Sequence, residues 1–278
     1  RALKLSNTKQ YGASNIRFGH AENTVLHSST RATADSDVGT IRYLSFHDNK
    51  YLRVFAGHTA SVTSLEVAPN NDLFISASND GTVRVWDMRT PDCVGMLEVP
   101  SGAAPVVAYD PTGVCFAVAI YPGLVKMYIS KYADIAHKIP FFNCNVEEHL
   151  EGAHIIGMEF SIDGRLVLLT TSRSKIVIID AFTGDYKASL NGFKNEISQT
   201  TASFSPDVRY VCCGSDEGFI HIWDWQTNTL VVSLEGHESI CRTAKFNPKR
   251  LQLASAGEHL TLWLASDTLR EYPSKSAA

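Results

Sequence analysis

Apolar and polar residues alternate along most of the chain in short runs, and small clusters of Gly, Pro, Asn and Asp separate these runs. The segments 73–77 and 210–213 are two of the most apolar runs, and each is followed by a tight polar turn. Alternation with a period of two, interrupted by turn residues, is typical of half-buried β-strands. One stretch, 145–152, fits a helical turn instead. The pattern therefore predicts an all-β fold.

The same unit recurs along the chain. Its clearest copies are Thr-Val-Arg-Val-Trp-Asp at 82–87 and Phe-Ile-His-Ile-Trp-Asp at 219–224. Six such units place a large apolar residue at the position of the tryptophan: Leu44, Trp86, Tyr128, Ile179, Trp223 and Trp263. The gaps of 42, 42, 51, 44 and 40 residues average about 44, a period typical of four-stranded propeller blades. We expect a β-propeller with six visible blades, residues 1–278 forming a single domain, and these six residues at equivalent buried positions.

The units resemble WD40 repeats over essentially the whole chain. A Gly-His pair at 57–58 precedes Trp86, and a second pair at 236–237 precedes Trp263. That family has seven blades, so the resemblance implies that an N-terminal blade is missing or incomplete here. The segment 2–6 fits an outer strand that precedes the first visible unit.

The resemblance also implies one polar cluster. In the WD40 family a His, a Ser, an Asp and a Trp form a hydrogen-bonded tetrad within a blade, and the matching positions here are His58, Ser76, Asp80 and Trp86. The last unit keeps three of these positions, as His237, Ser255 and Trp263. The unit that ends in Trp223 has apolar or longer side chains at the other three: Phe193, Cys213 and Glu217.

A converging Ser, His and Asp also occurs in hydrolases. The chain lacks the Gly-x-Ser-x-Gly elbow that usually presents a nucleophilic serine. Mutual hydrogen bonds among the four side chains would satisfy polar groups that are costly to bury unpaired. We therefore expect a structural tetrad, no catalytic residues, no cofactor and no enzymatic activity.

The composition of the chain limits the kinds of partner that it is expected to bind. The chain is 44% apolar and 19% charged, and its net charge of −4 disfavours direct binding to nucleic acid or anionic membranes. Its six cysteines form no Cys-x-x-Cys pair, which favours free, buried thiols in a reducing compartment such as the cytosol or nucleus. The Cys, His and Glu residues of 143–154 match neither a His-Glu-x-x-His nor a Cys₂His₂ spacing, so we expect a solvated loop and no metal site.

Two long connections are candidate partner-binding segments. The first, 30–39, is an insertion that carries Arg31, Asp35 and Asp37, and the second, 142–154, carries Glu147, Glu148 and His149. Long loops between rigid strands often carry binding surfaces, and an ordinary solvated loop is the alternative for both. If the blades follow the propeller family, both connections lie on the same face.

A further hypothesis rests on Arg89. The sequence Trp86-Asp87-x-Arg89 matches the motif of substrate receptors for cullin-based ubiquitin ligases. The fold already accounts for Trp86 and Asp87, and the motif is common by chance, so only Arg89 supports this alternative.

The segment 40–58 is more specific than a generic repeat. It closely resembles the WD-repeat subunits of nuclear SET-domain methyltransferase complexes, and the segments 180–184 and 246–248 fit the same subfamily. The resemblance implies a non-enzymatic nuclear scaffold. Its implied partners are a SET-domain subunit of a histone lysine-4 methyltransferase complex, or protein phosphatase 1 with its nuclear targeting subunit in transcription termination and RNA 3′-end processing. The sequence leaves open which of these complexes the chain joins.

Overall fold

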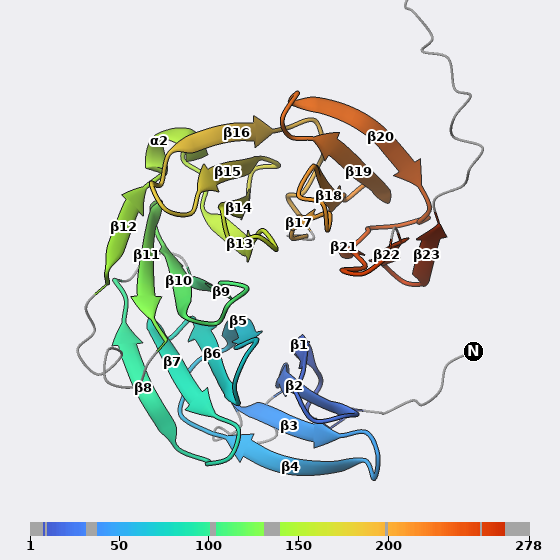
Figure 1. Ribbon diagram of the computed structural model, residues 1–278. Helices are drawn as coiled ribbons and strands as arrows, with labels where there is room; N and C mark the ends of the chain where they lie inside the picture. The colour runs from blue at the N-terminus through green and yellow to red at the C-terminus, as the bar shows by residue number, and fades with distance from the viewer. Residues whose placement is uncertain are drawn as a thin grey trace, which may run out of the picture.

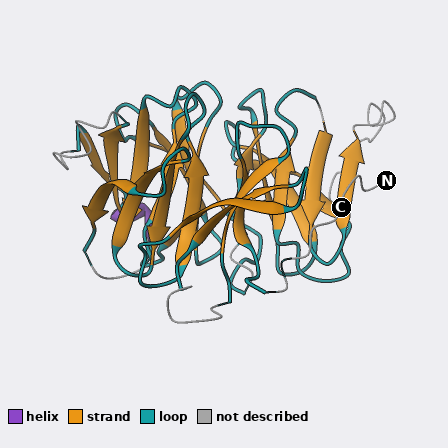
Figure 2. Cartoon of the chain, turned by 90° about the horizontal axis from the view of Figure 1, so that it is seen from below, coloured by secondary structure: helices purple, strands orange, loops and turns teal. Residues whose placement is uncertain are grey.

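Six β-sheets stand side by side around a central axis (Figure 1). The structure, a computed structural model, describes residues 8, 10–31, 38–100, 104–130, 140–197, 200–250 and 252–264. Within each sheet the strands follow one another along the chain, and neighbouring strands are antiparallel. Figure 2 shows the strands running between two faces, where the loops gather. The all-β, six-bladed propeller expected from the period of about 44 residues is confirmed.

The first three sheets have four strands each. The first sheet contains β1 (Ser14–Phe18), β2 (Thr24–Ser28), β3 (Ile41–Ser45) and β4 (Lys50–Phe55). The second contains β5 (Val62–Val67), β6 (Leu73–Ser78), β7 (Thr82–Asp87) and β8 (Cys93–Glu98). The third contains β9 (Val106–Tyr109), β10 (Cys115–Ile120), β11 (Leu124–Ile129) and β12 (Phe142–Asn145).

Among the described residues, the last sheet has one strand fewer than the others. The fourth sheet contains β13 (Ile155–Phe160), β14 (Leu166–Thr171), β15 (Ile176–Asp180) and β16 (Tyr186–Leu190). The fifth contains β17 (Ser203–Phe204), β18 (Tyr210–Gly214), β19 (Phe219–Asp224) and β20 (Thr229–Glu235). The sixth contains β21 (Thr243–Phe246), β22 (Gln252–Ala256) and β23 (Leu260–Leu264).

The segment 142–154 is not the plain loop that the sequence suggested. Its first residues form β12, and its middle forms the short helix α2 (Glu147–Leu150), as the helical pattern of 145–152 predicted. Hydrogen bonding to β11 makes β12 the outer strand of the third sheet. No helix in the described part of the chain has the length and apolar content that crossing a membrane requires.

The third strand of every sheet carries one of the six equivalent residues. Five of them are buried: Leu44, Trp86, Tyr128, Ile179 and Trp223. The sixth, Trp263, is half-buried. In four sheets the register shifts immediately before the equivalent residue, at Leu44, Trp86, Ile179 and Trp223. The shift marks a β-bulge, which increases the local twist of the third and fourth strands.

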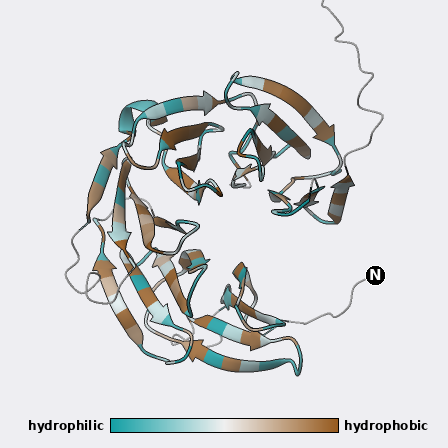
Figure 3. Ribbon diagram, viewed as in Figure 1, coloured by the Kyte–Doolittle hydropathy of each residue, from teal (hydrophilic) through white to brown (hydrophobic). Residues whose placement is uncertain are grey.

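The core consists of layers between adjacent sheets. In the fourth sheet, for example, Leu168 and Ile178 pack toward Val211 of the fifth, whereas Val167 and Leu169 pack toward the third. Figure 3 shows brown apolar residues along most of the strands and teal hydrophilic residues in many of the turns. Because successive side chains of a strand point to opposite faces, an inner strand must be apolar on both sides.

The first and last sheets flank an opening in the ring of described residues (Figure 1). On the last sheet Leu260, Leu262 and Leu264 are each 71% exposed, so no described sheet covers that face. The outer strand expected at 2–6 lies outside the described residues, and the expectation of a further N-terminal blade stays a prediction.

Candidate functional site

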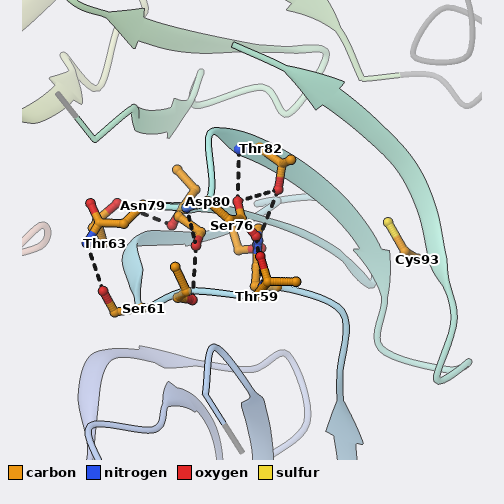
Figure 4. A network of polar contacts seen from close by, with 12 residues as sticks. Thr59, Ser61, Thr63, Ser76, Asn79, Asp80, Thr82 and Cys93 are labelled. Atoms are coloured by element: carbon orange, nitrogen blue, oxygen red, sulfur yellow. Dashed lines mark hydrogen bonds and ion pairs between the residues drawn. The ribbon is translucent and has the colours of Figure 1, made fainter. Parts of the chain in front are cut away.

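The residues at 58, 76, 80 and 86 meet inside the second sheet, near the turn between β6 and β7. Figure 4 labels Ser76 and Asp80 of this cluster. The Trp86 Nε1–H donates to Ser76 Oγ over 2.8 Å, and Ser76 Oγ lies 2.7 Å from His58 Nε2. His58 Nδ1 lies 2.8 Å from Asp80 Oδ2. Gly81, with φ of +76°, closes the turn that presents Asp80. These contacts form a continuous chain from the indole to the carboxylate.

Burial and hydrogen bonds set the pKa values of His58 and Asp80 in this hydrogen-bonded cluster. Burial lowers the pKa of His58, although Asp80 acts in the opposite direction. Burial alone would raise the pKa of Asp80, but hydrogen bonds from the Thr82 hydroxyl and the Thr59 N–H, together with His58, outweigh it and lower the pKa to about 2. Ser76 is fully buried and His58 is 4% exposed. Since the serine oxygen already contacts both rings, the arrangement satisfies buried polar atoms and does not present a nucleophile to a cleft.

The other sheets repeat this arrangement only partly. In the last sheet, Trp263 Nε1 donates to Ser255 Oγ over 2.8 Å, and the same oxygen lies 2.8 Å from His237 Nε2. In the fifth sheet, Phe193 packs edge-on against Trp223 with ring centroids 5.4 Å apart. Apolar contact therefore replaces the hydrogen bonds at that position.

A channel of about 870 Å³ runs along the axis, lined by the first strands or their loops in all six sheets. Two ion pairs lie in it: Arg17 contacts Glu66 over 2.6 Å, and the Lys245 ammonium contacts Glu159. Glu159 also accepts hydrogen bonds from the Ser203 hydroxyl and a neighbouring backbone N–H. Glu159 of the fourth sheet thus connects to the fifth and sixth sheets. Sequence reasoning missed this contact, because no local pattern marks a pair 86 residues apart.

The partner-binding candidates are widely distributed. Arg31 is exposed beside the first sheet, and its backbone N–H donates to Tyr11 O. Asp35 and Asp37 lie outside the described residues, so the expectation that 30–39 shares a face with 142–154 stays a prediction. The guanidinium of Arg89 is exposed and pairs with Asp87 over 2.7 Å, so contacts within its own turn account for its position.

The helix α2 carries the other three candidates. Glu147 and Glu148 are exposed in its first turn. The ring of His149 stacks on Tyr186 of the fourth sheet, with centroids 4.3 Å apart. Nothing in the sequence indicated that Tyr186 contacts His149. This stack depends on how the third and fourth sheets pack against each other.

The cysteines of the described residues are all free thiols. Cys212, Cys213 and Cys241 are buried, and burial raises the pKa of each. Burial raises the pKa of Cys144 to about 11. A thiol with a raised pKa is a poor nucleophile, so these side chains act as small apolar groups.

Comparison with known proteins identifies a consistent set of relatives. The family described as "WD domain, G-beta repeat" matches residues 49–87 and 184–224. WD repeat-containing protein 82 of Drosophila melanogaster is 41% identical over 262 residues, which cover 93% of this chain and 78% of the fly protein. COMPASS component SWD2 of Saccharomyces cerevisiae is 31% identical over 92% of this chain and 79% of its own length. Set1 complex component swd2 of Schizosaccharomyces pombe is 40% identical over 66% of this chain and 48% of its own length.

Proposed function

We propose that this chain, a member of the WD40-repeat family, is a scaffold subunit of a nuclear histone methyltransferase complex. The family includes WD repeat-containing protein 82 and SWD2. The observation that carries the proposal is the match to two yeast proteins named as Set1 or COMPASS components, one of them over 92% of this chain. In this role the chain holds other proteins together and performs no chemistry itself.

The geometry supports a scaffold. The His, Ser and Asp side chains that resemble a hydrolase triad are committed to one another and to Trp86 inside the second sheet. A rigid ring of sheets exposes loops, grooves and strand edges, and extended partner segments commonly dock on such features. Long loops on a rigid framework are where such contacts concentrate.

The proposed partners are a SET-domain subunit of a lysine-4 methyltransferase complex and, in a second setting, protein phosphatase 1 with its nuclear targeting subunit. Both follow from the resemblance of 40–58 to nuclear WD-repeat scaffolds. The proposed location is accordingly the nucleus. The ubiquitin-ligase alternative rests on Arg89 alone, and the Asp87 pair already explains that residue.

Affinity purification of the tagged full-length protein from nuclear extract, followed by mass spectrometry, tests the proposal. We expect a SET-domain subunit, or phosphatase 1 with its targeting subunit, among the proteins recovered. Recovery of neither, from cells in which both complexes are intact, contradicts the proposed function. Deleting 31–38 tests the insertion, because unchanged recovery of every partner rejects it as a docking segment.

A further inference from the structure

At the outer rim of the ring, α2 and β12 of the third sheet lie beside the fourth sheet (Figure 1). Aromatic side chains from both sheets meet there. The rings of His149 and Tyr186 stack with centroids 4.3 Å apart and planes inclined by 26°. Tyr186 is 43% exposed, and Phe182, in the turn between β15 and β16, is 73% exposed. These three residues, with Glu147 and Glu148, form what we call the rim surface.

The framework that presents these rings is well defined. Asp180 Oδ1 accepts the backbone N–H groups of Phe182 and Thr183 over 2.9 and 3.1 Å and so shapes the turn. Gly184, at φ of +75°, lies so close to β12 that an added Cβ would be 2.5 Å from the Cβ of Cys144. The turn of the fourth sheet is therefore seated on the outer strand of the third. Exposed aromatic side chains on such a pre-organised framework are typical anchors of protein interfaces.

Among the described residues, two acidic side chains without an ion pair lie on α2, the helix that carries His149. Glu147 and Glu148 are exposed directly before His149, and the ion pairs among the described residues include neither of them. The neighbouring lysines are already engaged, since Lys175 contacts Glu151 over 2.7 Å and Lys187 contacts the carboxylate that shapes the turn over 3.3 Å. The rim surface thus combines aromatic faces with carboxylates that are free to accept hydrogen bonds.

We propose that the rim surface binds an arginine-bearing segment of a partner protein, an inference that rests on the proposed scaffold function. A guanidinium stacks on aromatic faces, while its N–H groups bind carboxylates in a fork-like geometry. The chain itself contains such a contact: the Arg42 guanidinium carbon lies 3.4 Å from the ring centroid of Tyr11 and 5.6 Å from that of Tyr51. A lysine gains the charge attraction without the planar stacking, and an anionic partner is repelled.

Binding of a defined probe tests this inference. The probe is a fluorescein-labelled eight-residue peptide of alternating Gly and Arg, and its affinity for the full chain is measured by fluorescence anisotropy. We expect Phe182→Ser and Glu148→Lys each to weaken binding about tenfold, the loss typical of an interface anchor. The matched controls are Ile162→Ser, at a residue 55% exposed elsewhere, and Glu238→Lys, at an exposed carboxylate in the connection between β20 and β21. Both controls are expected to bind the probe like the unmodified chain.

Three results overturn the inference: equal affinity in the rim variants and their controls, equal affinity for a Gly-Lys peptide, or tighter binding by Glu148→Lys. Thermal unfolding of each variant verifies that the fold is intact.

Nuclear co-purification separates this inference from the proposed function. Unchanged recovery of every partner by Phe182→Ser rejects the rim surface while the scaffold stands. Rim-dependent peptide binding by a chain that recovers no nuclear complex supports the surface and refutes the proposed function.

Discussion

Replacing Ser76 by alanine isolates the contribution of the buried polar cluster. The change removes one oxygen, which accepts from Trp86 Nε1 over 2.8 Å and lies 2.7 Å from His58 Nε2. Both rings are almost completely buried, at 0% and 4% exposure. The variant therefore leaves a donor and a ring nitrogen without partners in a site that water cannot easily enter.

The expected loss follows from these two orphaned groups. An unsatisfied buried polar group costs about 1–3 kcal/mol, so Ser76→Ala is expected to lower the free energy of unfolding by about 2–6 kcal/mol. The chain offers a matched control in Ser255, which contacts Trp263 and His237 at 2.8 Å each. Those two rings are only half-buried. Because water can replace the missing hydroxyl there, Ser255→Ala is expected to cost about 1 kcal/mol.

Urea unfolding followed by tryptophan fluorescence and by circular dichroism measures both variants. Coincident transitions from the two probes justify a two-state free energy. Equal losses in Ser76→Ala and Ser255→Ala would refute the reasoning, because they would show that burial of the ring partners does not set the cost. Hydrolytic activity that disappears in Ser76→Ala with the fold intact would refute the structural role itself.

Three further predictions test other parts of the fold. Trp86→Ala, at a fully buried residue, is expected to cost about 3–5 kcal/mol in urea unfolding, and a cost below 1 kcal/mol would contradict its place in the core. Glu159→Gln is expected to destabilise the chain more than Glu238→Gln at an exposed site, since it weakens contacts with the fifth and sixth sheets; hydrogen exchange in β21 measures the effect, and equal protection contradicts it. Because burial holds the pKa of His27, in β2, below that of the unfolded chain, its stabilising contribution is complete above about pH 6.5 and is lost as the pH falls from there through the lower pKa of the folded state. The melting temperature should therefore decline less between pH 7 and 5 in His27→Gln than in the unmodified chain, and parallel declines would argue against the assignment.

Local pattern was sufficient for the repeat and for most strands. The period-two alternation and the Gly, Asn and Asp turns specify individual hairpins, because strand faces and turn conformations depend on neighbouring residues. A recurrence of about 44 residues then specifies sheets that stack around an axis. The tetrad positions, among them His58 and Trp86, came instead from the resemblance to WD40 repeats, which implies them at set places within one repeat.

Contacts between sheets were decided only by the tertiary structure. The outer strand β12 was missed because it follows a long insertion after β11 and lacks the alternation seen elsewhere. The ion pair between Glu159 and Lys245 and the stack of His149 on Tyr186 join residues far apart in the chain. Which side chains meet across two sheets depends on the twist of each sheet and on the angle between neighbours. Those quantities arise when all the sheets pack together, so no single segment of sequence encodes them.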